Sequence, residues 1–215
     1  MFPRALEPTV DGLVALGGDY TPAAILEAYP KGIFPWTGEH PVPWFSPDPR
    51  MLLVPGDVRR SRSTRQAVRN KGFEVRYDTA FVPLILMCAV QPRPGQDGTW
   101  ITPNVVETWA ELNAMGHAHS VETWRDGELV GGLYGLSFGR AFFGESMVSL
   151  VADASKVALV TLCTRLERAG YHFIDCQQVT DHMLRMGGGP VDRPSFLTRL
   201  KAAVALPDGW QSDAG

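Results

Sequence analysis

The sequence predicts an α+β fold with a largely antiparallel sheet, and three neighbouring patterns support this prediction. Residues 119–150 alternate apolar and polar positions in three runs separated by short glycine-containing turns, which is typical of an antiparallel meander. A helical pattern follows the meander, and an apolar strand at 171–176 follows the helix. With 215 residues and 45% hydrophobic side chains, the chain can bury a full core.

The first 56 residues are rich in Pro, Gly and Trp, and we expect them to form a small domain before a larger one at 57–215. One helix is predicted there, because Thr21 can cap it, Pro22 suits its first position, and Pro30 follows its end.

Aromatic side chains are frequent in this segment. Trp36, Trp44 and Phe45 either form the core of the small domain or offer a stacking platform for a nucleobase. Trp36 and Tyr29 are the better candidates for stacking, because each lies beside Gly or Pro residues that can hold a ring at a rim.

The segment 50–76 carries eight basic side chains against two acidic ones, in a chain whose net charge is −3. A helix that ends at Gly72 places Arg62, Arg65 and Arg69 along one stripe. Such a stripe is either a solvated helix face or a contact for a phosphate backbone.

Residues 73–119 predict a strand at 73–76, a helix at 79–90, a turn-rich loop at 91–98 and a helix at 102–115. His117 and His119 follow, but no third ligand is near in sequence, so we expect a helix-to-strand connection rather than a metal site.

After the meander, Asp153 or Ser155 can cap a helix that runs to Ala169. Its apolar stripe has helical spacing and consists of Leu159, Leu162, Cys163 and Leu166. The strand at 171–176 leads into a short helix containing Thr180, a glycine-rich break at 187–190 and a closing helix at 194–204.

Two carboxylates, Glu145 and Asp175, lie in the apolar strands on either side of this helix. Burying an unpaired charge is costly. Either each acid has a fixed internal partner, or the pair awaits a cation from outside the chain; we expect the second.

Composition excludes several classes of protein. The net charge of −3 argues against extensive nucleic-acid coating. Three cysteines without C-x-x-C spacing indicate neither a disulfide framework nor a zinc knuckle. The chain has neither an apolar leader nor a run of 18 apolar residues, so we expect a cytoplasmic protein without a membrane partner.

The order of meander, helix and strand resembles the acetyltransferase (GNAT) superfamily. Coenzyme A users hold pyrophosphate on a glycine-rich turn that opens this helix. Here residues 149–156 contain no glycine and one acid, Asp153, so we expect a different acyl donor.

Seven segments, in the same order and at similar spacing, resemble bacterial leucyl/phenylalanyl-tRNA–protein transferases. They are residues 12–19, 32–36, 44–50, 98–102, 118–122, 144–147 and 175–177. The resemblance covers nearly the whole chain except the short N-terminus and the tail beyond about residue 203.

This resemblance implies an enzyme that transfers Leu or Phe from aminoacyl-tRNA to the N-terminal α-amine of proteins beginning with Lys or Arg, marking them for N-degron degradation. It implies a small N-terminal domain on a GNAT-like domain, a monomer, and neither a metal nor coenzyme A.

The resemblance also assigns roles to residues. The 3′-adenosine is implied to stack near Tyr29, Trp36, Trp100 and Trp109. The donor side chain is implied to enter an apolar pocket formed by Leu133, Phe142, Met147, Leu159, Leu162, Leu166 and Ile174. The basic segment is implied to meet acceptor-stem phosphates through Arg59, Arg60, Arg62, Arg65, Arg69 and Arg76.

Glu145 and Asp175 then bind the acceptor's cationic side chain or its α-ammonium group. Side chains two apart on a strand point the same way, so we expect Gln177 to orient the attacking amine with help from Asp175. Leu162 and Leu166 stand where a relative carries Phe, which leaves the preference among Leu, Phe and Met open.

Two further departures concern other parts of the site. Trp109 stands where Tyr is common, and the role of Thr180 in the loop 178–182 is open. Three alternatives are an N-acetyltransferase, a tRNA-binding module without catalysis and a transferase for acidic N-termini. Two carboxylates would repel an acidic acceptor, which argues against the third alternative.

Overall fold

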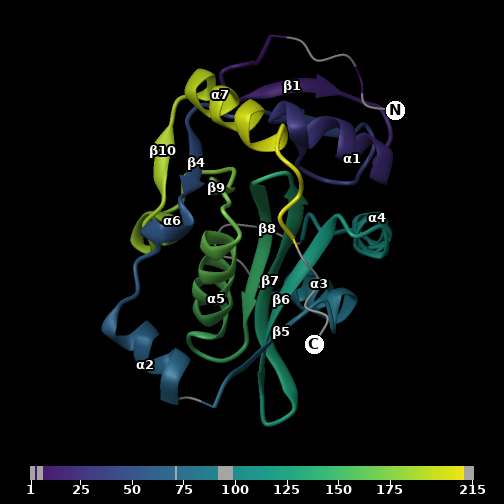
Figure 1. The fold of residues 1–215 in the computed structure, drawn as a ribbon. Coiled ribbons are helices and arrows are strands. Elements are labelled where there is room, and N and C mark those ends of the chain that lie inside the picture. The colour runs from purple at the N-terminus through teal and green to yellow at the C-terminus, as the bar shows by residue number, and fades with distance from the viewer. Residues whose placement is uncertain (1–2, 4–6, 71, 92–98, 211–215) are drawn as a thin grey trace.

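The computed structural model describes residues 3, 7–70, 72–91 and 99–210. Lys71 of the basic segment and most of the predicted loop at 91–98 lie outside these residues. The structure contains a three-stranded sheet and a seven-stranded sheet with helices packed around them (Figure 1). The predicted α+β class with a largely antiparallel sheet is confirmed, because every strand pair except β8–β9 is antiparallel.

The large sheet has the strand order β10-β4-β9-β8-β7-β6-β5. Its strands are β4 (Arg50–Leu53), β5 (Glu74–Tyr77), β6 (Ala118–Arg125), β7 (Glu128–Phe138), β8 (Ala141–Ser149), β9 (Phe173–Asp175) and β10 (Gly189–Val191). The predicted meander is β6, β7 and β8. The predicted glycine-rich break at 187–190 is wrong in part, because β10 pairs with β4 there and extends the sheet edge.

The predicted helices form close to their expected bounds. They are α1 (Pro22–Ala28), α2 (Arg62–Asn70), α3 (Phe81–Val90), α4 (Pro103–Ala114), α5 (Ala154–Arg168), α6 (Asp181–Met186) and α7 (Arg193–Val204), with 3-10 turns at Tyr29–Lys31 and Pro55–Asp57. Thr21 caps α1 as expected, since its hydroxyl accepts a hydrogen bond from the backbone N of Ala24 at 3.3 Å. Asp153 does not cap α5; its φ is +75° and its carboxylate pairs with Lys156 instead.

The N-terminal segment forms a small sheet that the sequence did not predict. Its strands are β1 (Leu13–Leu16), β2 (Phe34–Pro35) and β3 (Pro43–Phe45), in the order β1-β3-β2. Trp44 is fully buried there, and its indole Nε1 donates to the carbonyl of Gly17 at 2.9 Å, so this ring is core. The next strand, β4, belongs to the large sheet, and the division at residue 56 stays a prediction.

Two hydrophobic cores lie on opposite faces of the large sheet. Neighbouring strand residues point to opposite faces, and Phe142 and Phe143 of β8 accordingly belong to different cores. One core joins α1, α3, α4, α7 and the small sheet, while the other joins α5 and α6 (Figure 1).

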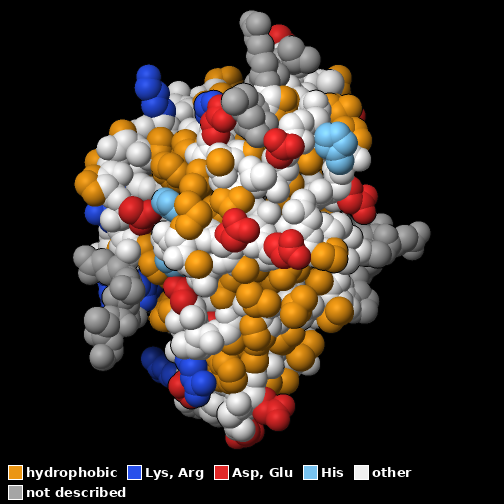
Figure 2. Space-filling model, turned by 90° about the vertical axis from the view of Figure 1, so that its right-hand side faces the viewer, with side chains coloured by type: hydrophobic (Ala, Val, Ile, Leu, Met, Phe, Trp, Pro, Cys, Tyr) orange, Lys and Arg blue, Asp and Glu red, His pale blue; other side chains and the backbone are white. Residues whose placement is uncertain are grey.

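Hydrophobic side chains gather on the face of the molecule beside α3 and α4 (Figure 2). Helix α3 exposes Val82, Leu86 and Val90, which are spaced four residues apart and therefore form one stripe. Among the described residues, no helix is both long enough and apolar enough to cross a membrane.

Strand β8 contains a bulge in the middle of the sheet. Tyr134 pairs with Ser146 and Gly135 pairs with Gly144, so Glu145 has no opposite residue on β7. A bulge bends its strand and can re-aim a side chain. Glu145 is therefore set apart from the regular alternation of β8.

The parallel pair of strands separates beside this bulge. The pairing of β8 with β9 ends at Phe143 and Asp175, where β9 itself ends, while β8 continues to Ser149. Backbone groups beyond that point no longer pair across the two strands. This separation places Glu145 next to the loop that follows β9.

Candidate functional site

Asp175 is held by an internal arginine. Its Oδ1 and Oδ2 accept hydrogen bonds from Nε and Nη2 of Arg50 at 2.8 and 2.7 Å, and the two side chains are 0% and 1% exposed. Arg50 also donates to the carbonyl of Gly32 and lies against the rings of Phe34 and Phe196. The prediction that Asp175 awaits an external cation is therefore wrong, because a fully buried carboxylate requires a partner within the fold.

Glu145 has a different environment. Its Oε1 accepts hydrogen bonds from the Tyr29 hydroxyl at 2.8 Å and from Nε2 of Gln177 at 2.7 Å. The structure gives Oε2 no hydrogen-bond partner among the residues that it describes. Burial raises the pKa of Glu145 to about 8, and the Asp175 charge adds to the effect, while the bonds from Tyr29 and Gln177 oppose it.

Gln177 follows a sharp change in backbone direction after β9. Its φ is +60°, and its backbone N donates to Oδ1 of Asp175 at 2.9 Å. The prediction that the two side chains point the same way is wrong, because the strand ends before Gln177. Asp175 points to Arg50, whereas Gln177 points to Glu145.

A cavity of about 630 Å³ opens beside Glu145. Six of the seven residues predicted for the donor pocket line it: Leu133, Phe142, Met147, Leu159, Leu162 and Ile174. The seventh, Leu166, is fully buried in the core that contains α5 and does not line the cavity. Leu162 and Leu166 are therefore not equivalent, although both belong to the same helical stripe.

The wall of this large cavity also carries polar side chains that were not predicted. They are Gln91, Ser146, Ser149, Ser155, Thr180 and His182. Thr180 has a local signal, because it caps α6 by accepting from the backbone N of Met183. The others have no distinctive spacing in the sequence.

A smaller cavity of about 200 Å³ adjoins the large one. Trp36 and Trp100 lie in its wall, and Trp36 is 39% exposed, so both predicted rings border open space. Glu145, Cys176 and Thr180 line both cavities. The two cavities therefore meet at Glu145.

The other two predicted stacking residues are buried. Trp109 is 0% exposed, and its Nε1 donates to the Tyr20 hydroxyl at 2.9 Å. Tyr29 is 1% exposed and packs edge-on against Trp109 and Phe143. The prediction that these rings stack on a base is wrong, because neither ring presents a free face.

A third cavity, the basic groove, lies between α2 and α5 and has a volume of about 810 Å³. Arg60, Arg65 and Arg69 line it, and their contact with phosphates stays a prediction. Three further arginines on its wall, Arg140, Arg165 and Arg168, come from a distant part of the chain and were not predicted.

The remaining predicted phosphate contacts lie elsewhere. Arg59 and Arg62 are exposed but are not part of the groove wall. Arg76 pairs with Glu74 at 2.7 Å and stacks on the ring of Trp124. Arg76 does not line the groove, and its place in the phosphate set stays a prediction.

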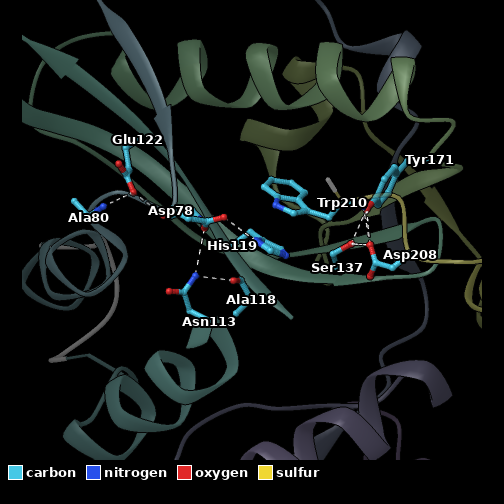
Figure 3. Close-up of polar contacts among 11 residues, drawn as sticks. Asp78, Ala80, Asn113, Ala118, His119, Glu122, Ser137, Tyr171, Asp208 and Trp210 are labelled. Carbon is cyan, nitrogen blue, oxygen red and sulfur yellow. Dashed lines mark hydrogen bonds and ion pairs between the residues drawn. The ribbon is translucent and has the colours of Figure 1, made fainter. Parts of the chain in front are cut away.

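His119 and Glu122 lie on β6, within the segment 118–122 that resembles the transferase family. Their hydrogen bonds connect this strand to the segment before α3 (Figure 3). Nδ1 of His119 bonds Asp78 at 2.8 Å, and its ring stacks on Trp210 with centroids 4.1 Å apart. Glu122 accepts from the backbone N of Ala80, which ties β6 to the start of α3. Within the described residues no group of three metal-ligating side chains occurs, and the contacts of His119 with Asp78 and Trp210 tie β6 to neighbouring segments.

The chain was compared with known protein families. The profile described as leucyl/phenylalanyl-tRNA protein transferase matches residues 52–201, and the N-terminal domain profile of the same name matches residues 18–48.

Individual relatives carry the same name, leucyl/phenylalanyl-tRNA–protein transferase. The protein of Solidesulfovibrio magneticus is 53% identical over 202 residues, covering 94% of this chain and 81% of its own. That of Aromatoleum aromaticum is 52% identical over 198 residues, covering 92% and 83%. That of Thiobacillus denitrificans is 49% identical over 209 residues, covering 96% and 91%.

Proposed function

The chain belongs to the leucyl/phenylalanyl-tRNA–protein transferase family, and we propose that it transfers Leu or Phe to proteins that begin with Lys or Arg. It is an aminoacyltransferase, as its relatives are. The donor is an aminoacyl-tRNA, the acceptor is an N-terminal α-amine, and the product is marked for N-degron degradation. We expect the enzyme to act as a monomer in the cytoplasm.

The observation that carries this proposal is the pair of cavities that meet at Glu145. The large, mainly apolar cavity suits the side chain of Leu, Phe or Met. In the small cavity, Trp36 and Trp100 suit the 3′-adenosine, because stacking on aromatic rings tolerates any base. A donor that occupies both cavities has its ester at the junction.

The basic groove suits the acceptor stem of the tRNA. Arginines from α2 and α5 face one hollow in a chain that is acidic overall. Such contacts neutralise phosphates and carry no base specificity. The terminal adenosine and the amino acid then supply the selectivity.

Glu145 is the acid proposed to meet the acceptor, since Arg50 already neutralises Asp175. A carboxylate at the junction attracts a peptide start that carries a cationic side chain as well as an α-ammonium group. The same charge disfavours acidic N-termini. Asp175 is proposed to act indirectly, by fixing the backbone of Gln177.

We also propose a GNAT-like fold for residues 57–215 and a separate small domain at 1–56. The separation of the parallel strands β8 and β9 after a meander supports the first assignment. The three-stranded sheet within residues 13–45 supports the second. Fold likeness alone does not identify the chemistry.

The test is a donor-by-acceptor matrix. The protein is incubated with labelled Leu-tRNA or Phe-tRNA and with peptides that begin with Arg, Lys, Gln or Asp. We expect label on the Arg and Lys peptides without added coenzyme A. Binding of charged tRNA with no labelled peptide would indicate a binding module, and stabilisation by acetyl-CoA but not puromycin would indicate an acetyltransferase.

A further inference from the structure

Among the described residues, three side chains line both cavities and so surround the point where the donor ester would lie: Glu145, Cys176 and Thr180. The acceptor amine must lose a proton there before it can attack. Burial and the neighbouring Asp175 charge raise the pKa of the Cys176 thiol well above its ordinary value, so it stays protonated. The Thr180 hydroxyl is not basic and caps α6. Glu145 is the base among the three.

Two neighbours of Glu145 cannot take this proton. Both Asp175 oxygens accept from Arg50, and Oδ1 also accepts from the backbone N of Gln177. The Gln177 amide nitrogen donates to Glu145, and a carboxamide is a very weak base. His182 lines the large cavity but not the small one, so it is not among the residues shared by the two cavities.

We propose that Oε2 of Glu145 accepts the proton from the α-ammonium group of the acceptor, while Tyr29 and Gln177 hold Oε1. This assignment rests on the proposed function and specifies its chemistry. The two hydrogen bonds to Oε1 orient the carboxylate, and Oε2 has no partner among the described residues. The bulge of β8 places this side chain at the junction instead of in the regular strand alternation.

The reaction balances without an added reagent. Glu145 takes one proton from the α-ammonium group, and the neutral amine attacks the ester carbonyl to form the new C–N bond. As the bond from the carbonyl carbon to the ribose oxygen breaks, the second proton of the nitrogen passes to that oxygen. The protonated Glu145 then releases its proton to water.

Several titratable and polar groups surround Glu145 and the cavity beside it. They are Tyr29 and Tyr20 from the N-terminal segment, Arg50 from β4, Asp175, Cys176 and Gln177 from β9 and its loop, and His182 from α6. Burial raises the pKa of Glu145 to about 8 and the Asp175 charge adds to the rise, while the bonds from Tyr29 and Gln177 and the Arg50 charge oppose it. A model α-amine has a pKa of about 7.7–8.0, so proton transfer between the two groups is nearly balanced.

Single-turnover transfer from Phe-tRNA to saturating Arg-peptide, measured across pH, tests the assignment. For Glu145→Gln we expect the rate to fall by about 10²–10⁴-fold near neutral pH. The difference should shrink as pH rises, because the amine then loses its proton without help. A weaker peptide affinity alone, with an unchanged rate at saturation, would overturn the proposal.

A second pair of variants tests the proposal without removing the carboxylate. Tyr29→Phe removes a hydrogen bond that lowers the pKa of Glu145, so the acid limb of the profile should move to higher pH. Tyr20→Phe is the matched control, because its hydroxyl accepts from Trp109 and does not bond Glu145. An acid limb that moves equally in both variants, or that disappears in His182→Gln, would contradict the role of Glu145.

These outcomes are distinguishable from failure of the proposed function. If the wild-type protein labels no peptide at any pH, the proposed function fails. If the wild type labels the Arg-peptide and Glu145→Gln shows the same pH profile at the same rate, only the assignment of the proton acceptor fails.

Discussion

Arg50 and Asp175 form a doubly hydrogen-bonded ion pair in the protein interior, with N–O distances of 2.8 and 2.7 Å. The pair joins β4 to β9, and the same carboxylate accepts from the backbone N of Gln177. It therefore fixes the turn from which Gln177 reaches Glu145. Removing one charge should affect both the stability of the fold and the geometry of the site.

We expect Arg50→Met to lower the free energy of unfolding by about 3–5 kcal/mol, because it leaves the buried Asp175 carboxylate without a cationic partner. Urea unfolding measures this. Arg50→Met combined with Asp175→Leu should recover part of the stability, and exposed Arg199→Met serves as the control. If the free energy of unfolding falls no further in Arg50→Met than in the control, the ion pair does not stabilise the fold.

The large cavity predicts an effect on donor selection. Leu162→Phe adds volume at the cavity wall and should lower transfer of Phe relative to Leu by about 10-fold or more. Leu166→Phe is the matched control, because Leu166 is buried but does not line the cavity. It should lower stability by about 1–3 kcal/mol through overpacking without changing the ratio of Phe to Leu transfer. Single-turnover rates with both charged tRNAs measure the ratio, and an equal shift in the two variants would exclude this cavity as the donor pocket.

The basic groove predicts a change in salt dependence. Replacing Arg65 or Arg69 with Ala should weaken tRNA binding and reduce the slope of log K against log salt by about one for each phosphate that the arginine neutralises. Arg76→Ala is the control, since Arg76 is paired with Glu74 outside the groove. Filter binding over a salt series measures both, and a larger effect at Arg76 would place the tRNA outside the basic groove.

The small cavity predicts which tryptophan meets the adenosine. Trp36→Ala should weaken binding of puromycin by about 1–3 kcal/mol, the usual contribution of one stacked base. Trp109→Phe should lower thermal stability instead and leave puromycin affinity unchanged, because Trp109 is buried. Calorimetric titration and thermal melts separate the two effects. Unchanged affinity in Trp36→Ala would remove the small cavity as the adenosine site.

The raised pKa of Glu145 predicts a pH dependence of stability. Its pKa is about 8 in the folded protein and near 4.5 when the chain is unfolded, so the folded state favours the protonated form. Its contribution to stability is complete below the unfolded value and is lost as pH rises through the folded value. The free energy of unfolding should therefore fall between about pH 5 and pH 9 more steeply in the wild type than in Glu145→Gln. Equal slopes in urea titrations would contradict the shift.

Local patterns predicted the elements of the fold well. The cap at Thr21 lies within its own helix turn, and the helical stripe of Leu159 and Leu162 identified part of the cavity wall from spacing alone. The strand at 189–191 was missed, because its glycine and proline have low strand propensity, which the pairing with β4 overrides.

The site depends on relationships that sequence spacing does not contain. Arg50 and Asp175 are 125 positions apart, and no sequence pattern paired Arg50 with Asp175. The bulge at Glu145 depends on the pairing register between β7 and β8. A shift of that register by one residue would turn the side chains to the opposite face of the sheet. The sequence therefore indicated which acids matter but not that only one of them remains open to the cavities.

The most direct test is a crystal structure of the protein with puromycin, whose aminoacyl group is joined to the nucleoside by a stable amide. The account predicts the nucleobase beside Trp36 and Trp100, the aromatic side chain in the cavity lined by Leu162, and the amide carbonyl next to Oε2 of Glu145. Puromycin bound in the basic groove, or with its side chain outside the large cavity, would contradict it.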